Sequence, residues 1–433
     1  MGGESDGGGL RSADDTESAR VGPQRALEWL LDQHLGVAMD APGFRADPYP
    51  AYDALRSISP VLRVPEMGEV LVTGYDEALA VLRDPRFSTN AAHRRWPGGT
   101  PPPEVAGAPP LRGANVLLFI DPPDHTRIRR LVSAAFTPRT VERLRSRVAE
   151  MVADIGDRAA DEGGLDVIAD LGFTVPVTVI CELMGVPTED QHLFGPWSSD
   201  VSRILDGFSL TPDEVNAAAV AAAQMVGYFT DLFARRRAEP ADDLVSALLA
   251  VESEGERLSE VELFSTTLLL FIAGHETTTN LIGNGVWALL RNRDQLVALH
   301  RDPGLAPSAV EELLRFDSPV HVTARIPTVD VEVAGHQFAA GEQLIVLLSA
   351  ANRDPRRFAD PDRLDVTRAD NHHLAFSQGM HFCLGAALAR LEGAEAIGGL
   401  VARFGDSIEV VSDPVTYRDH FVLRGLQELR VSV

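Results

Sequence analysis

The feature that most constrains this chain is one long apolar segment, residues 259–292, which reads SEVELFSTTLLLFIAGHETTTNLIGNGVWALLRN. Ser259 and Glu262 form a capping-box pattern, which predicts the start of a helix. A helix of this length that is apolar on most faces has to run through the centre of the protein. Its longest apolar run, LLLFIAG at 268–274, is too short to span a bilayer, so we expect a soluble protein built around this helix.

The middle of this segment departs from what a core helix prefers. Residues 273–279 read AGHETTT, and three threonines, a glycine and an acid are poor choices for a buried helix. Glycine alone costs about 1 kcal/mol relative to alanine. Local preferences that are violated in the middle of a buried element indicate function.

The rest of the pattern predicts a mainly α protein with a small β region. Helical periodicity dominates, and short strand-like stretches occur at 61–74, at 329–348 and near the C-terminus. The second of these is expected to form a hairpin through Ala334-Gly335, with another turn at Gly341. We expect residues 1–24 to be a disordered tail and residues 25–433 to form one domain, in which the Pro- and Gly-rich stretch 94–113 is a long loop.

Charge and cysteine content narrow the class of protein. The 433 residues carry a formal net charge of -24, which argues against nucleic acid or an anionic membrane as the main partner. Two cysteines cannot make a disulfide framework, and the N-terminus lacks the apolar core of a signal peptide, so we expect a cytoplasmic protein.

One of the two cysteines lies in a turn-rich stretch, LAFSQGMHFCLG at 374–385. A zinc site is weakly supported, because no second ligand pair accompanies Cys383, and HETTT at 275–279 lacks the second histidine of H-E-x-x-H. GNGVWA at 283–288 lies inside the long helix, so we discard it as a dinucleotide fingerprint. Cys383 could also be a nucleophile beside His381. The alternative, at roughly even odds, is an inert buried thiol. We expect Cys181 to be such an inert thiol.

A third interpretation is a heme thiolate. One cysteine thiolate can hold a porphyrin iron, and it needs backbone N–H donors near a helix N-terminus, with glycines that let the backbone pass close by. Residues 379–390 supply such a turn followed by a strong helix former.

The pattern Phe376-x-x-Gly379-x-His381-x-Cys383-x-Gly385 closely resembles the heme-binding loop of the cytochromes P-450. Many members of that family have glycine at the position of Ser377, which we take as a tolerated variant. The resemblance runs in the expected order from about Asp47 to the C-terminus. It implies the prism-shaped helical cytochrome P-450 fold, heme b as cofactor and Cys383 as the axial ligand of the iron.

The same resemblance explains the unusual residues in the middle of the long helix. Its AGHET segment resembles the family's oxygen-activating segment. The resemblance implies that Ala273 and Gly274 leave room for dioxygen, that Thr277 hydrogen-bonds it, and that Glu276 relays protons. On the residues alone, a threonine that bonds back to the i−4 carbonyl is an alternative, and the two are compatible.

Further matches imply residues that hold the heme and the fold beneath it. Four residues match the positions that bind the heme propionates: His125, Arg129, Arg325 and His381. Glu312 and Arg315 resemble the family's E-x-x-R pair, and the resemblance maps the third member of this structural triad to Arg363.

The implied activity is monooxygenation of a hydrophobic small molecule by O2, for example a steroid, terpenoid, macrolide or fatty acid. No NAD(P)H site is visible, so a ferredoxin-type donor with an NAD(P)H-dependent reductase is expected, docking on a local patch of Arg127, Arg130 and Arg390. A peroxide-dependent peroxygenase and a non-catalytic heme-binding sensor are the alternatives. The residues expected to line an apolar substrate pocket are Leu117, Leu118, Leu205, Phe208, Val320, Val322, Phe421 and Val422.

Overall fold

The structure is a computed structural model that describes residues 23–96, 99, 116–205, 210–252, 255–412 and 414–433. The expected tail, 1–24, lies outside the described residues except for Pro23 and Gln24. These two residues begin helix α1 (Pro23–Leu35), so the predicted boundary is two residues too late. Proline is well suited to the first turn of a helix. Most of the predicted loop 94–113, and Phe208 of the predicted pocket, also lie outside the described residues.

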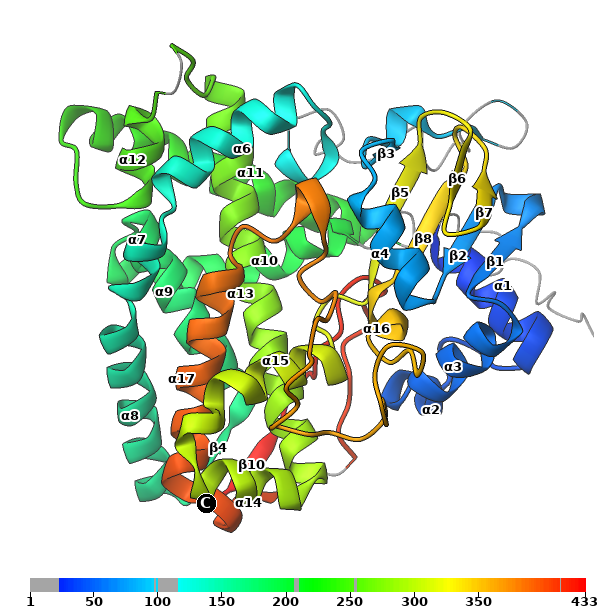
Figure 1. Cartoon of the computed structure of the whole chain (residues 1–433). Helices are drawn as coiled ribbons and strands as arrows, with labels where there is room; N and C mark the ends of the chain where they lie inside the picture. The colour runs from blue at the N-terminus through cyan, green and yellow to red at the C-terminus, as the bar shows by residue number, and fades with distance from the viewer. Residues whose placement is uncertain (1–22, 97–98, 100–115, 206–209, 253–254, 413) are drawn as a thin grey trace, which may run out of the picture.

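The long central helix is confirmed as α13 (Glu260–Arg291). Ser259 accepts a hydrogen bond from the Glu262 backbone, and the Glu262 side chain accepts one from the Ser259 backbone, as the capping box predicts. Most of its residues are buried, and it runs through the helical part of the molecule (Figure 1).

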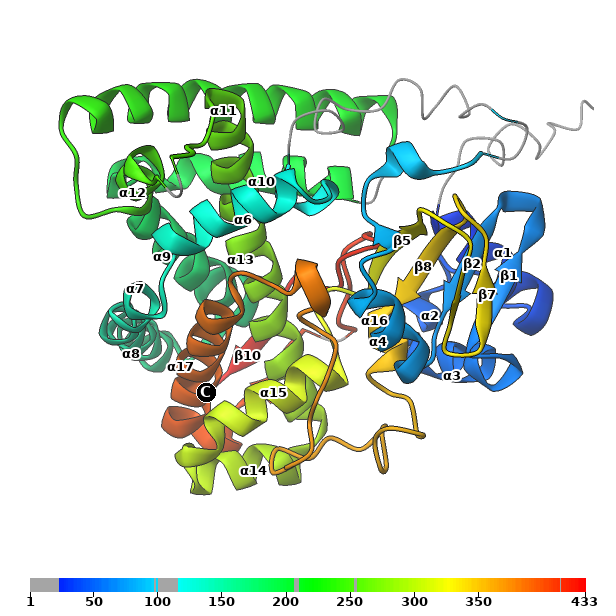
Figure 2. The same ribbon diagram turned by 45° about the horizontal axis from the view of Figure 1, so that its top comes forward.

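Helices pack around α13 on several sides (Figures 1 and 2). The closest neighbours are α9, α10, α15, α17 and the π-helical turn at 167–173. The bounds of the helices in this part are α6 (Asp124–Ala135), α7 (Pro138–Glu142), α8 (Arg145–Glu162), α9 (Thr174–Met184), α10 (Gln191–Ser202), α11 (Pro212–Ala238), α12 (Leu244–Ala250), α14 (Arg293–Arg301), α15 (Ala306–Phe316) and α17 (Ala386–Phe404).

A small five-stranded sheet forms the other part of the molecule, at the right of Figure 1. Its strand order is β1-β2-β8-β5-β3, and the only parallel pair in it is β2 with β8. The elements of this part are α2 (Pro42–Ala46), α3 (Tyr49–Ile58), β1 (Val61–Val64), β2 (Glu69–Val72), α4 (Tyr75–Arg83), β3 (Phe87–Ser88), β5 (Val322–Pro327), β8 (Gln343–Leu347) and α16 (Leu348–Ala351).

Two smaller pairings complete the β structure. Strands β6 (Val331–Val333) and β7 (His336–Phe338) form the predicted hairpin, with φ of 51° at Ala334 and 77° at Gly335. Positive φ at both central residues suits the right-handed twist of the strands. The second sheet contains β4 (Gly164–Asp166), β10 (Arg430–Ser432) and β9 (Glu409–Val410).

The five-stranded sheet is buried on both faces. Alternate residues along its strands belong to two different hydrophobic clusters, one on each face. Val70 and Leu344 pack with α4, whereas Leu71 and Ile345 pack with α1 and α3. Side chains of a strand alternate between the two faces, so β2 and β8 carry almost only apolar residues.

By length and composition alone, two helical stretches among the described residues are apolar enough to cross a membrane. The stretch Val167–Met184 is 67% buried in the protein, as a core helix would be. Helix α11 is 33% buried and lies along one edge of the molecule (Figure 2).

Candidate active site

The loop before α17 holds Cys383 in a defined turn. Residues Gly379–His381 form one 3-10 turn, and the Cys383 N–H donates to the Phe376 carbonyl at 2.9 Å. Gly379 has φ of 70°, and a Cβ there would collide with the backbone of α4 at Leu82. Glycine is therefore required at this position for two reasons. Gly385 differs, since it has φ of -84° and only open space beside its Cα.

Cys383 is exposed, although protein atoms surround it closely enough that burial raises the pKa of its thiol. The Gly385 N–H, Arg129 and Arg390 lower the pKa and offset part of the burial. The predicted N–H donor to the sulfur is thus present, and these three groups favour the thiolate form of Cys383.

Four basic groups from three elements face one another beside this loop. The rings of His125 on α6 and His381 lie 4.4 Å apart. Arg129, one turn after His125, donates to the Phe382 carbonyl at 2.6 Å. Burial, together with the charges of Arg325, His125 and Arg129, lowers the pKa of His381 to about 3.

Among the described residues, none of these four groups forms an ion pair with a carboxylate. Arg325 on β5 is buried, which lowers its pKa to about 10, and the buried Nε2 of His125 has no hydrogen-bond partner in the described structure. Two of the four groups, Arg129 and Arg325, are guanidinium groups that stay charged, and a buried cation such as Arg325 needs an anion. The donor set therefore fits the two propionates of heme, and His125, Arg129, Arg325 and His381 are the residues that would hold them.

The unusual middle of α13 is not fully buried. Ala273 is exposed and Thr277 is partly exposed, although most of the residues around them are buried. The Thr277 hydroxyl donates to the Ala273 carbonyl at 2.9 Å, so the i−4 back-bond that the sequence allowed is present. The two lone pairs of its oxygen stay available to accept hydrogen bonds.

Gly274 was expected to leave room for dioxygen, but the structure shows a different need for a small residue there. A Cβ at this position would lie 3.1 Å from Cδ1 of Ile180 on α9. The small residue at 274 therefore allows α13 to approach α9, and it is Ala273 that presents the open face.

Glu276 is buried and ionised. Burial raises its pKa, but the hydrogen bond and charge of His275, with Arg418 and His420, outweigh that effect and lower it to about 2. Arg418 donates to Oε2 at 3.0 Å. The sequence analysis missed Arg418 altogether, because it lies 142 residues away in a loop without a motif. His275 was considered only as a zinc ligand.

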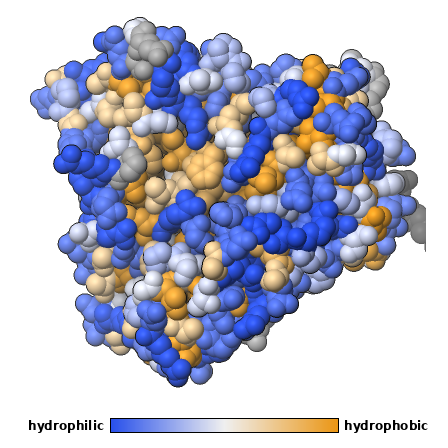
Figure 3. Space-filling view, in the orientation of Figure 1, coloured by the Kyte–Doolittle hydropathy of each residue, from blue (hydrophilic) through white to orange (hydrophobic). Residues whose placement is uncertain are grey.

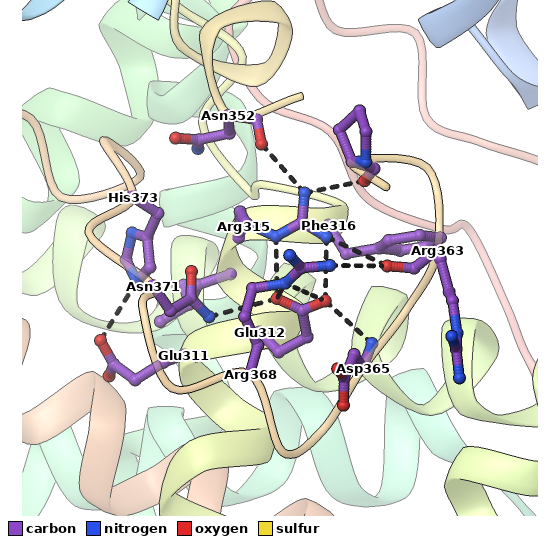
Figure 4. A network of polar contacts seen from close by, with 12 residues as sticks. Glu311, Glu312, Arg315, Phe316, Asn352, Arg363, Asp365, Arg368, Asn371 and His373 are labelled. Atoms are coloured by element: carbon purple, nitrogen blue, oxygen red, sulfur yellow. Dashed lines mark hydrogen bonds and ion pairs between the residues drawn. The ribbon is translucent and has the colours of Figure 1, made fainter. Parts of the chain in front are cut away.

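The structure brings together two of the three predicted members of the structural triad (Figure 4). Arg315 and Glu312 are fully buried and pair at 2.8 and 2.9 Å. The third side chain is that of Arg368, whose Nε lies 3.1 Å from Glu312 Oε2. The assignment of Arg363 is wrong, because its side chain is exposed and only its carbonyl joins the network, accepting from Arg315 and Arg368.

The predicted pocket residues do not gather in one cluster. Leu117 belongs to the large helical core, and Leu118 beside it is 37% exposed. Leu205 is partly buried just before the undescribed residues 206–209. Val322, Phe421 and Val422 pack in the cluster under α1 and α3, while Val320 packs on the other side of the sheet.

The docking patch stays a prediction, and its three arginines are all paired with carboxylates. Arg127 pairs with Glu262, Arg130 with Glu256 and Arg390 with Glu311. Carboxylates thus neutralise all three guanidinium groups. Around α6 and the upper end of α17, Figure 3 shows a gathering of apolar side chains within a largely hydrophilic face.

Glu392 on α17 is a buried acid that the sequence analysis did not single out. Neither carboxylate oxygen has a hydrogen-bond partner by geometry among the described residues. Burial raises its pKa to about 8, and nearby Thr278 offsets only part of this rise. The side chain is therefore a neutral acid at pH 7, packed between α17 and α13.

This acid should make stability depend on pH. The folded state keeps the Glu392 proton up to about pH 8, whereas the unfolded chain releases it near 4.5, so the free energy of unfolding falls as pH rises between these values. The shift corresponds to a loss on the order of 5 kcal/mol. Glu392→Gln should flatten this slope in urea unfolding of the heme-loaded protein, whereas Glu395→Gln, on the half-exposed side of α17, should not. Equal slopes for Glu392→Gln and wild type would contradict the assignment.

Comparison with known proteins agrees with this geometry. The model of the cytochrome P-450 family matches residues 75–302 and 305–426. The chain is 43% identical to a vitamin D(3) 25-hydroxylase of Pseudonocardia autotrophica, covering 90% of this chain and 94% of that protein. It is 41% identical to the 6-deoxyerythronolide B hydroxylase of Saccharopolyspora erythraea, over 91% and 98% of the two chains.

A solved structure shows the same fold. P450BioI, in complex with an acyl carrier protein that bears hexadec-9Z-enoic acid, superposes with a TM-score of 0.82 at 37% identity, covering 90% of this chain and 99% of that one. Family membership carries heme dependence with it. The chain therefore belongs to the cytochrome P-450 family and is a heme-dependent monooxygenase, an oxidoreductase.

Proposed function

We propose that the protein inserts one oxygen atom of O2 into a hydrophobic small molecule, with electrons supplied by a separate ferredoxin and its reductase. The observation that carries the proposal is the partly exposed Thr277 beside the buried, ionised Glu276, in the stretch of α13 where Ala273 is also exposed. An acid next to an alcohol is suited to moving protons one at a time toward a small bound molecule.

Each residue has a defined task in this proposal. Cys383 would hold the heme iron through its thiolate, and His125, Arg129, Arg325 and His381 would hold the propionates. Heme, when bound, supplies O–O bond cleavage, which a cysteine thiolate promotes by donating electron density. The oxygen of Thr277 can accept hydrogen bonds on the open face of α13. Its hydroxyl donates to the Ala273 carbonyl and becomes free to donate elsewhere when it rotates. Glu276, with its low pKa, passes protons on rather than storing them.

The substrate class is proposed on apolar chemistry and on relatives. The relatives are named for hydroxylating a secosteroid and a macrolide precursor, and the neighbouring structure holds a fatty acid on a carrier protein. These three molecules share a large apolar body. We extend that class, together with terpenoids, to this chain, and we keep Leu117, Leu118, Leu205, Val320, Phe421 and Val422 as candidate contacts.

The test is turnover with two different oxidants. A panel of steroid, macrolide and fatty-acid substrates is offered with O2, NADPH, ferredoxin and reductase, or with hydrogen peroxide alone. The proposal predicts product in the first assay, with an oxygen atom that comes from labelled O2. Product only with peroxide would favour the peroxygenase, and binding without product in either assay would favour the ligand sensor.

A further inference from the structure

Glu276 lies between two basic side chains that are anchored in different parts of the molecule. Arg418, in the loop before β10, donates to Oε2 at 3.0 Å. On the other side, Nε2 of the fully buried His275 lies 3.6 Å from Oε1. The same loop is fixed to α13 a second time, where the Asn284 amide donates to the Arg424 carbonyl at 3.0 Å.

His275 in turn is tied to α10. Its Nδ1 lies 3.0 Å from the Phe271 carbonyl, and since a carbonyl only accepts, Nδ1 carries a proton. Its Nε2 lies 2.7 Å from the Ser198 hydroxyl of α10. That hydroxyl is also 2.8 Å from the carbonyl of Phe194, one turn earlier on the same helix.

These contacts allow two arrangements of protons. When the imidazole is neutral, Ser198 donates to the single lone pair of Nε2, and the ring brings no positive charge to the carboxylate. When it is an imidazolium, Nε2 donates, Ser198 donates to Phe194 instead, and the positive ring stabilises the Glu276 carboxylate. In the second arrangement each donor and acceptor of Glu276, His275 and Ser198 faces a partner of the correct kind.

We propose that His275 and Ser198 are positioning residues that hold Glu276 ionised and make its charge depend on where α10 lies. This deepens the proposed function and rests on it, because it concerns the acid that relays protons. Helix α10 ends at Ser202, three residues before Leu205, which the sequence analysis expects to line the substrate pocket. Substrate that displaces α10 would therefore alter the Ser198–His275 bond and change how readily Glu276 takes up a proton.

The charged and titratable groups that act on Glu276 are few. They are His275 on its own helix, and Arg418 and His420 on the C-terminal loop. Helix α10 contacts His275 through the hydroxyl of Ser198, which carries no charge of its own. Removing the imidazole should therefore weaken the ionised state of Glu276 even while Arg418 remains.

A double-mutant cycle tests this without any turnover. Melting temperatures of the heme-loaded protein are measured at pH 7 for wild type, His275→Phe, Glu276→Gln and the double variant. We expect Glu276→Gln to lower the melting temperature clearly in the wild-type background and much less in His275→Phe. Additive shifts would overturn the proposal. If His275→Phe does not fold, the same cycle with Ser198→Ala, controlled by the exposed Ser199→Ala, gives the answer.

A second readout separates this proposal from the proposed function. In turnover, Ser198→Ala should move the acid limb of the pH profile of product formation to higher pH, whereas Ser199→Ala should leave the profile where it is. An unchanged profile in Ser198→Ala contradicts the positioning role. If the melting temperatures are non-additive but Glu276→Gln does not alter product formation, the positioning holds and the proton relay of the proposed function fails.

Discussion

Glu312→Gln is expected to lower the free energy of unfolding by about 3–5 kcal/mol, because it leaves a buried cation without its counter-charge. Glu312 accepts hydrogen bonds from Arg315, from Arg368, from the Asp365 backbone and from Asn371. Burial lowers the pKa of Arg315, and Glu312 offsets this. Glutamine has nearly the same size, so the loss reports the charge and not a cavity.

The matched control is Glu311→Gln, at the neighbouring position of α15. Glu311 pairs with Arg390 and His373, and its side chain is 29% exposed. We expect a much smaller loss for this variant in urea unfolding at pH 7, with heme saturating in all samples so that its binding energy is the same throughout. Similar losses for the two variants would contradict the view that the Glu312 network supports the fold.

The same assay tests the identity of the third member of the network. Arg368→Leu removes a side chain that lies 3.1 Å from Glu312, whereas Arg363→Leu removes one that only reaches solvent. Arg368→Leu should be the clearly less stable of the two variants. The opposite order would restore the assignment that the sequence suggested.

Replacing the acid and the alcohol together is expected to have the largest effect on catalysis. In Glu276→Gln/Thr277→Val, product formed per electron should fall by about 10²–10⁴-fold, the usual contribution of a positioned general acid or base. Valine keeps the shape of threonine and removes only the hydroxyl. Electron consumption should continue, so that reduced oxygen species appear in place of product.

Thr278→Val is the control for the loss of a hydroxyl at the next position of the same helix. Thr278 also bonds back to the i−4 carbonyl, of Gly274, but it is buried and does not face the open side of α13. Its replacement should leave the ratio of product to electrons close to that of wild type. Equal losses in the Thr277 and Thr278 variants would remove the special role of Thr277.

The elements that local sequence patterns determine could be predicted well. The length, capping box and burial of α13, the hairpin at 331–338 and the turn before Cys383 all depend on residues close together in the chain. Glu312 and Arg315 lie one turn apart on a helix, so their pairing also follows from spacing.

Contacts between distant segments could not be predicted in the same way. Arg363 and Arg368 lie in one irregular stretch, and which of them turns inward depends on the packing of the segment against α15, for which no periodicity exists. Arg418 reaches Glu276 from a loop with no motif. Glu392 looks like any polar residue of a helix, and only the position of α13 shows that it is buried.

The spread of the predicted pocket residues has the same cause. Motif-poor segments carry no signal of which face they present, and several of them lie outside the described residues. Val322 alternates with its neighbours along β5, so its place beneath α1 and α3 follows from the register of the sheet and not from its own side chain.

The central claim is that Cys383 holds heme as a thiolate, and the most direct measurement is the absorption spectrum of the reduced protein with carbon monoxide. The account predicts a strongly red-shifted Soret band for wild type and for Cys181→Ser, and the loss of that band in Cys383→Ser. A wild-type spectrum typical of histidine ligation, or a band that survives in Cys383→Ser, would contradict it.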